Sequence, residues 1–140
     1  MLRSTTSRTI DSVRYLLDTH AFLWLATDDP QLTQTARAVF IDNDQECFLS
    51  AASIWEMAIK SSLGKLSIAT TLEHLVRGGR ERGLRLLDVT RDHAYLVERL
   101  PLHHRDPFDR LLVAQAMHEG MSLISCEAQL DAYAVTRIWS

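Results

Sequence analysis

Four acidic residues stand where an apolar run ends or a helical pattern begins; they are Asp18, Glu56, Asp109 and Glu127. Carboxylates that are brought together repel one another, so such a cluster needs a cation or a proton. Carboxylate ligands without His or Cys suit Mg²⁺ or Mn²⁺ rather than zinc, and such ions activate a water against a phosphodiester. The chemistry to expect is phosphoryl transfer to water, with Glu56 as a candidate to accept the proton of the water.

Each acid also has a structural interpretation. Asp18 could cap the helix that follows it, with Thr19 at the first helical position. Ser53-x-x-Glu56 has the pattern of a capping box, and Glu127 could be an exposed turn residue. These alternatives stay open for each residue alone. The combination of all four, each near a strand end or a helix start, favours a common site.

The segment 103–116 is the clearest helix start in the chain. The side chain of Asp106 can accept from free backbone N–H groups, and Pro107 fits the first helical position. Asp109 then falls in the first turn, where the helix dipole favours a carboxylate. We assign Asp106 mainly to capping, and Arg110 could orient a carboxylate or contact a phosphate.

Short apolar runs alternate with helical patterns along the chain. Strands are expected near residues 13–17, 47–49, 84–87, 122–124 and 135–138. Helices are expected near residues 19–26, 33–43, 50–63, 70–78, 90–100 and 107–119, with a short turn at 127–131. This alternation predicts an α/β fold: a single domain with a mostly parallel central sheet of four to five strands and helices on both faces. Ligands of such sheets bind at the carboxyl ends of the strands, where the acids are expected.

The composition limits the class of protein. The 140 residues carry a net charge of −3, which argues against binding nucleic acid by bulk charge but not against a local basic patch. Cys47 and Cys126 form no CxxC pair, which fits a reducing compartment, and we expect a cytoplasmic protein. No apolar run approaches a membrane span, so no membrane association is expected. We expect residues 1–12 to be a disordered tail before a domain at 13–140.

Four blocks of sequence carry a resemblance to a known family over residues 14–139. They are L-L-D-T-H-A-F-L-W-L, S-A-A-S-I-W-E-M-A-I-K, H-R-D-P-F-D-R-L-L-V-A-Q-A and L-I-S-C-E-A-Q-L-D-A-Y. They resemble the PIN domain and, more narrowly, the VapC-type toxins of bacterial toxin–antitoxin pairs. The resemblance implies an endoribonuclease that depends on Mg²⁺ or Mn²⁺, is usually a homodimer, and is held inactive by a cognate antitoxin. It also implies that Asp18, Glu56 and Asp109 are the three core acids.

The chain departs from the family at the fourth acid. The family usually has an Asp after the fourth strand, where this chain has Glu127, and Asp131 one turn later could substitute for it. The longer Glu side chain leaves open a catalytically weakened PIN-like binding or regulatory module that is kept for its partner contacts. A module that uses Asp18 as a phospho-acceptor is disfavoured, because no Lys occurs after Lys65.

Several residues are candidates for supporting roles. Thr19 could hydrogen-bond a water held by the ion. Contacts with RNA or the antitoxin could come from Lys60, Lys65, Arg77, Arg80 and Arg82, although such charges often only face solvent.

Aromatic residues and histidines near the predicted site are ambiguous. Trp24 and Trp55 belong either to the core or to a partner surface. His103 and His104 lack a third His or a Cys at zinc spacing, so we expect them to be solvated or to touch RNA at most.

Overall fold

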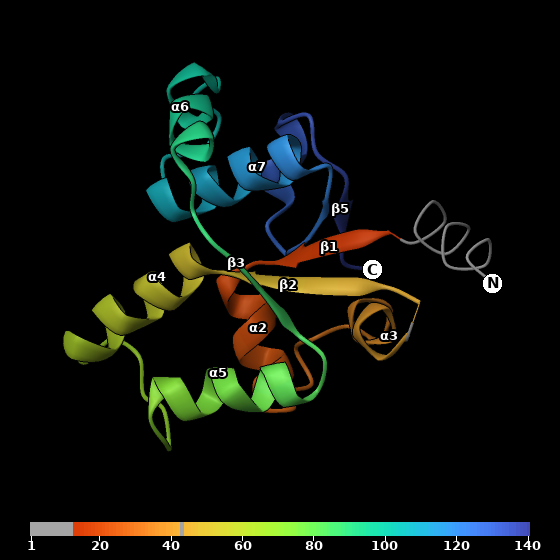
Figure 1. Cartoon of the computed structure of the whole chain (residues 1–140), viewed down its shortest axis with the longest axis vertical. Coiled ribbons are helices and arrows are strands. Elements are labelled where there is room, and N and C mark those ends of the chain that lie inside the picture. The colour runs from red at the N-terminus through yellow and green to blue at the C-terminus, as the bar shows by residue number, and fades with distance from the viewer. Residues whose placement is uncertain (1–12, 43) are drawn as a thin grey trace.

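The computed structural model describes residues 13–42 and 44–140, and their centre is a sheet of five parallel strands (Figure 1). The strands are β1 (Arg14–Leu17), β2 (Glu46–Ser50), β3 (Arg85–Leu87), β4 (Ser122–Ile124) and β5 (Arg137–Ile138). Their order in the sheet is β3-β2-β1-β4-β5, and every pair of neighbours is parallel. The predicted α/β fold is confirmed, with five strands. The predicted tail at 1–12 lies outside the described residues.

Six α-helices and one short 3₁₀ helix cover this sheet within the described residues. They are α2 (Thr19–Ala26), α3 (Gln34–Ile41), α4 (Ala51–Ser62), α5 (Leu72–Glu81), α6 (Arg91–Arg99), α7 (Pro107–Glu119) and the 3₁₀ helix η1 (Ala128–Ala132). In Figure 1, α6 and α7 lie above the sheet, and α2, α3 and α5 lie below it. Both faces of the sheet are therefore covered by helices, as its short apolar strands require.

Helix α5 continues three residues past its predicted end at Gly78, through Gly79 to Glu81. A Cβ added at Gly79 would lie 3.0 Å from Leu84 Cδ2 and 3.3 Å from Phe22 Cε1. The glycine thus lets α5 approach the core closely, and this packing outweighs its poor helix propensity.

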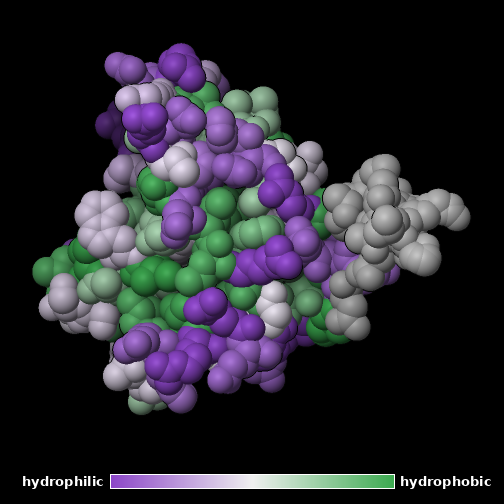
Figure 2. Space-filling model, in the orientation of Figure 1, coloured by the Kyte–Doolittle hydropathy of each residue, from purple (hydrophilic) through white to green (hydrophobic). Residues whose placement is uncertain are grey.

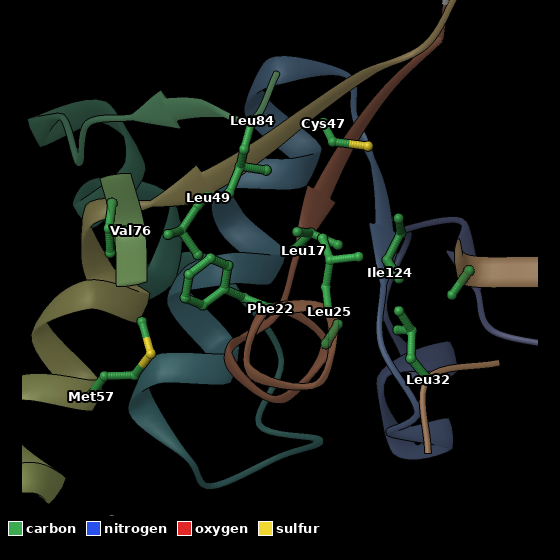
Figure 3. Packing of buried hydrophobic residues seen from close by; sticks show 12 residues of the cluster. Leu17, Phe22, Leu25, Leu32, Cys47, Leu49, Met57, Val76, Leu84 and Ile124 are labelled. Atoms are coloured by element: carbon green, nitrogen blue, oxygen red, sulfur yellow. The ribbon is translucent and has the colours of Figure 1, made fainter. Parts of the chain in front are cut away.

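Side chains that alternate along the strands build a core on each face. Leu17, Leu49 and Ile124 face the core formed with α2, α4 and α5, where Phe22 and Met57 are fully buried (Figure 3). The preceding residues of these strands, Leu16, Phe48 and Leu123, pack on the other face against α7. This alternation fixes the register of the sheet, because a slip of one residue would exchange the two cores.

No helix in the part of the chain that the structure describes is long and apolar enough to cross a membrane.

Candidate metal-binding active site

The candidate site lies at the carboxyl ends of β1 and β4. From β1 the chain builds β2 and β3 on one side of the sheet and β4 and β5 on the other, so the direction of winding reverses between β1 and β4. The backbone N–H of Asp18 donates to the carbonyl of Ile124 at 3.0 Å and ties these two strand ends together. This reversal is the position where open α/β sheets bind their ligands.

Asp18 is both a helix cap and a buried member of the site. Its side chain is the N-cap of α2, where Oδ1 accepts from the Ala21 N–H at 2.8 Å, and the residue is 3% exposed. Burial raises the pKa of Asp18, against the opposing effect of hydrogen bonds from Ser125 and the Ala21 N–H. Capping and site membership therefore coexist at this residue.

Ser125 is a site residue that the sequence analysis missed. It follows β4 directly, as Asp18 follows β1, and it is fully buried. Its hydroxyl hydrogen-bonds Asp18 and accepts from the Glu127 backbone N–H at 3.0 Å. Its position one residue after a short apolar run was the available signal.

Glu56 reaches the site from the second turn of α4 and is 5% exposed. The capping-box interpretation of Ser53 and Glu56 is wrong, because α4 is capped three residues earlier, by Ser50. Both carboxylate oxygens of Glu56 are engaged: Thr19 Oγ1 donates to Oε1 at 2.6 Å, and Lys60 Nζ donates to Oε2 at 2.7 Å. The hydrogen bond with Glu56 raises the pKa of Lys60.

Asp109 carries the clearest electrostatic signature of the cluster. It lies in the first turn of α7, whose predicted cap Asp106 is confirmed, and its side chain is 18% exposed. Burial raises the pKa of Asp109 to about 7, and the negative charges of Asp106, Asp18, Glu56 and Glu127 add to this effect. The structure therefore brings the four predicted acids into one electrostatic cluster.

Glu127 joins this cluster from an exposed position after β4. One ligand atom from each of His104, Asp109 and Glu127 lies within 4.8 Å of the others. Asp131, the alternative fourth acid, instead receives Arg137 Nε at 2.8 Å and Arg137 Nη2 at 3.0 Å. That pairing lowers the pKa of Asp131 and leaves Glu127 as the acid beside Asp109.

The expectation that His104 is solvated or touches RNA at most is wrong. Its side chain is 13% exposed, and Nε2 lies 3.2 Å from Asp109 Oδ2. The sequence offered only its position two residues before the helix cap Asp106.

The cluster fits a divalent cation. Its acids supply oxygen ligands, as Mg²⁺ and Mn²⁺ prefer. The negative charge of these acids exceeds the single positive charge of Lys60, which hydrogen-bonds Glu56. Burial and the negative charges of the neighbouring acids together raise the pKa of Asp109 to about 7, and a bound cation would relieve the repulsion between these acids.

The other predicted supporting residues have different surroundings. Arg110 donates to the carbonyls of Pro101 at 2.9 Å and Val97 at 3.0 Å, so we assign it to holding the end of α6 against α7. Lys65 is exposed in the turn after α4.

The predicted arginine cluster lies on and just after α5. Arg77 contacts Glu73 at 3.6 Å, and the guanidinium of Arg82 lies 5.3 Å from the ring centroid of Phe40. Arg77 and Arg80 border a groove of about 410 Å³ whose lining does not include the four acids. These arginines are therefore candidates for a partner surface rather than for the acidic site.

The two tryptophans separate into a packed and an exposed residue. Trp24 is half-buried and lies 5.7 Å from Trp139 between ring centroids. Trp55 is 62% exposed, and its ring meets the edge of Phe108 at 5.5 Å. Trp55 and Phe108 directly precede Glu56 and Asp109 in the sequence, so the exposed Trp55 and the half-buried Phe108 lie on the two helices that carry these acids.

Several solved structures of toxin–antitoxin proteins have a fold similar to that of this chain. VapBC2 of Rickettsia felis, bound to a promoter DNA fragment, matches with a TM-score of 0.70 at 13% identity, over 91% of this chain and 100% of the other. DNA-bound VapBC of Salmonella typhimurium matches with a TM-score of 0.67 at 15% identity, over 90% and 97%. VapBC-1 of nontypeable Haemophilus influenzae gives 0.60 at 14% identity, over 90% and 97%.

The sequence itself identifies the family. No curated protein matches the chain in a sequence comparison. The family model of the PIN domain matches residues 15–135, a range that includes all four acids. The chain belongs to the PIN-domain family.

Proposed function

We propose that the chain is a Mg²⁺- or Mn²⁺-dependent endoribonuclease toxin that a cognate antitoxin neutralises. The observation that carries this proposal is the cluster of carboxylates at the switch point of the sheet, where burial and the neighbouring acids raise the pKa of Asp109 to about 7. Membership of the PIN-domain family supports it, and so does the likeness of the fold to proteins solved as VapBC complexes.

Asp18, Asp109, Glu127 and Glu56 would hold the ion. When bound, it would supply Lewis acidity to a phosphodiester and to the attacking water. Glu56 is the candidate to accept a proton from that water. Thr19 and Lys60 fix the orientation of the two carboxylate oxygens of Glu56. The carboxylates would be placed before the substrate arrives, which lowers the cost of reorganisation during the reaction.

RNA could be held beside the acids by stacking and charge. The exposed ring of Trp55 offers a face on which an unpaired base can stack. Lys60 is partly exposed beside Glu56 and can attract the phosphate backbone. Both features favour a single-stranded or looped RNA as the substrate.

The antitoxin would use an exposed apolar surface of the protein. Figure 2 shows hydrophobic side chains gathered over α4, β3 and α5. The groove there is lined by Ile54, Leu72, Glu73, Val76, Arg77, Arg80 and Leu86. A segment docked in this groove could place a basic residue against the acids. We also propose that the protein is a cytoplasmic homodimer, as the family resemblance implies.

The test is cleavage of a mixed RNA pool by the purified full chain with Mg²⁺, with Mn²⁺ and with EDTA. Asp109→Asn is the matched control, because it keeps the shape of the side chain and removes its charge. Cleavage that needs the metal and is lost in Asp109→Asn would support the proposal. Equal cleavage by Asp109→Asn would show that the nuclease site lies elsewhere.

A catalytically weakened PIN-like module remains the second candidate. The observation that favours it is Glu127, a longer and exposed side chain where the family usually has Asp. Absence of cleavage with either metal would favour this candidate, and Glu127→Asp would then be the next variant to assay.

A further inference from the structure

We infer that His104 is a positioning residue that orients the carboxylate of Asp109 with its Nε2–H group, and that it is not a ligand of the metal. The inference rests on the proposed function, because it assigns a role within the same site. Its evidence is the set of hydrogen bonds around the first turn of α7 and the contact of 3.2 Å between His104 Nε2 and Asp109 Oδ2.

The surroundings of the imidazole assign its proton. The backbone N–H of Asp106 donates to His104 Nδ1 at 3.0 Å, so Nδ1 presents a lone pair. In a neutral ring the proton is then on Nε2, which faces Asp109 Oδ2 at 3.2 Å as a donor. A metal bound at Nε2 would need that nitrogen's lone pair, and the Asp106 N–H would then face a protonated Nδ1. The geometry therefore favours donation to Asp109 over ligation.

Two hydrogen bonds and the His104–Asp109 contact form a closed circuit. Asp106 Oδ1 accepts from the backbone N–H of Asp109 at 3.2 Å, and the N–H of Asp106 donates to His104. His104 in turn faces the Asp109 carboxylate. The backbone and the side chain of Asp109 are thus both held by the residues that begin α7, which limits the freedom of its carboxylate.

The loop that carries His104 is itself anchored. The backbone N–H groups of His103 and His104 both donate to Tyr133 Oη at 3.0 Å. Tyr133 lies just after η1 and is buried. His104 is therefore held in place before any ligand binds, as a residue that orients a metal ligand should be.

A second histidine in the chain has the same arrangement away from the acids. His93 Nδ1 accepts from the Thr90 N–H at 3.0 Å, and its Nε2 lies 2.8 Å from Glu119 Oε2. His93 is fully buried at the start of α6. There the arrangement joins two helices, whereas at His104 it acts on a carboxylate of the candidate site.

The first test needs no substitution. Nitrogen NMR of the histidine rings in the full-length protein reports which ring nitrogen carries the proton. We expect the Nε2–H form of His104 both without metal and with saturating Mg²⁺, which is diamagnetic. Loss of the Nε2 proton on adding Mg²⁺ would overturn the inference and make His104 a ligand.

The second test compares two substitutions of different length. His104→Gln places an N–H donor near the position of Nε2, whereas His104→Asn keeps an acceptor near Nδ1 and cannot reach Asp109. We expect His104→Asn to weaken Mn²⁺ binding and lower kcat by about 10- to 100-fold, as loss of a partner that orients a ligand does. His104→Gln should retain most of the Mn²⁺ affinity and most of the kcat of the parent. The KM should be unchanged in both variants.

His103→Asn is the matched control, because it removes an imidazole from the same loop, next to the ring of Tyr133. Its Mn²⁺ affinity, measured by calorimetry, should equal that of the parent. Equal losses in His104→Gln and His104→Asn would contradict positioning, and so would no loss in either. Because NMR and calorimetry need no RNA, this inference can fail while the nuclease proposal holds, and the reverse.

Discussion

Thr19 Oγ1 donates to Glu56 Oε1 at 2.6 Å, a buried hydrogen bond between residues 37 apart in the sequence. It joins the first residue of α2 to the second turn of α4. Lys60 binds the other oxygen of the same carboxylate at 2.7 Å. Helix packing thus orients Glu56 before any ligand arrives.

Thr19→Val should therefore impair both the site and the fold. The substitution keeps the shape but leaves Oε1 without its donor, which costs about 1–3 kcal/mol when the acceptor is charged and buried. We expect a lower urea midpoint and slower metal-dependent RNA cleavage. Thr19→Ser keeps the hydroxyl and should retain most of the activity. If the Val and Ser variants cut RNA at the same rate, the hydrogen bond does not serve the reaction.

The raised pKa of Asp109 predicts how the stability of the metal-free protein changes with pH. In the unfolded chain the carboxyl group of Asp109 has its ordinary pKa of 3.8, whereas in the folded protein its pKa is raised to about 7. Between these values the folded state binds more protons, so the free energy of unfolding falls as pH rises from about 4 to about 7. Urea unfolding in EDTA across this range measures the slope.

Asp109→Asn is the control for this slope. The variant cannot titrate at residue 109, so its stability should fall less over the same range. Some slope should remain, because burial also raises the pKa of Asp18. An unchanged slope in the variant would show that Asp109 titrates normally in the folded protein.

Glu127 should contribute less to the site than Asp109 does, because it is exposed and reaches the cluster from a loop. We expect Glu127→Gln to weaken Mn²⁺ binding about tenfold, or ~1.4 kcal/mol. Glu127→Asp should bind Mn²⁺ at least as well as Glu127→Gln, since it keeps the charge. Calorimetric titration with Mn²⁺ checks both variants. If Glu127→Gln bound Mn²⁺ as tightly as the parent, Glu127 would lie outside the metal site.

Tyr133→Phe should destabilise the loop before α7. It removes the acceptor of two backbone N–H groups, those of His103 and His104, and each orphaned group costs about 1–3 kcal/mol if it stays buried. Urea unfolding should show the loss. Tyr95→Phe is the matched control, because Tyr95 is 56% exposed on α6. Equal stability of the two variants would mean that water replaces the Tyr133 hydroxyl.

The sequence was sufficient to predict the features of the fold that depend on local chemistry. Asp106 and Pro107 begin α7 as predicted, and Gly120 ends it with a φ of 69°. Short apolar runs marked all five strands, although the edge strands β3 and β5 are less buried than the central β1, β2 and β4. Since parallel strands end at one edge of a sheet, the positions of Asp18 and Glu127 already indicated a shared site.

The sequence by itself determined the α/β fold, the helix starts and the four acids, because each depends on neighbouring residues or on the edge that parallel strands share. Only the tertiary structure decided which side chains meet there. Glu56 has the local pattern of a capping box, yet packing of α4 against α2 turns it toward Thr19. His104 and Ser125 enter the site through folding of the loop before α7 and the end of β4. Such contacts depend on how helices, strands and loops pack against one another. The spacing of residues along the chain does not reveal that packing.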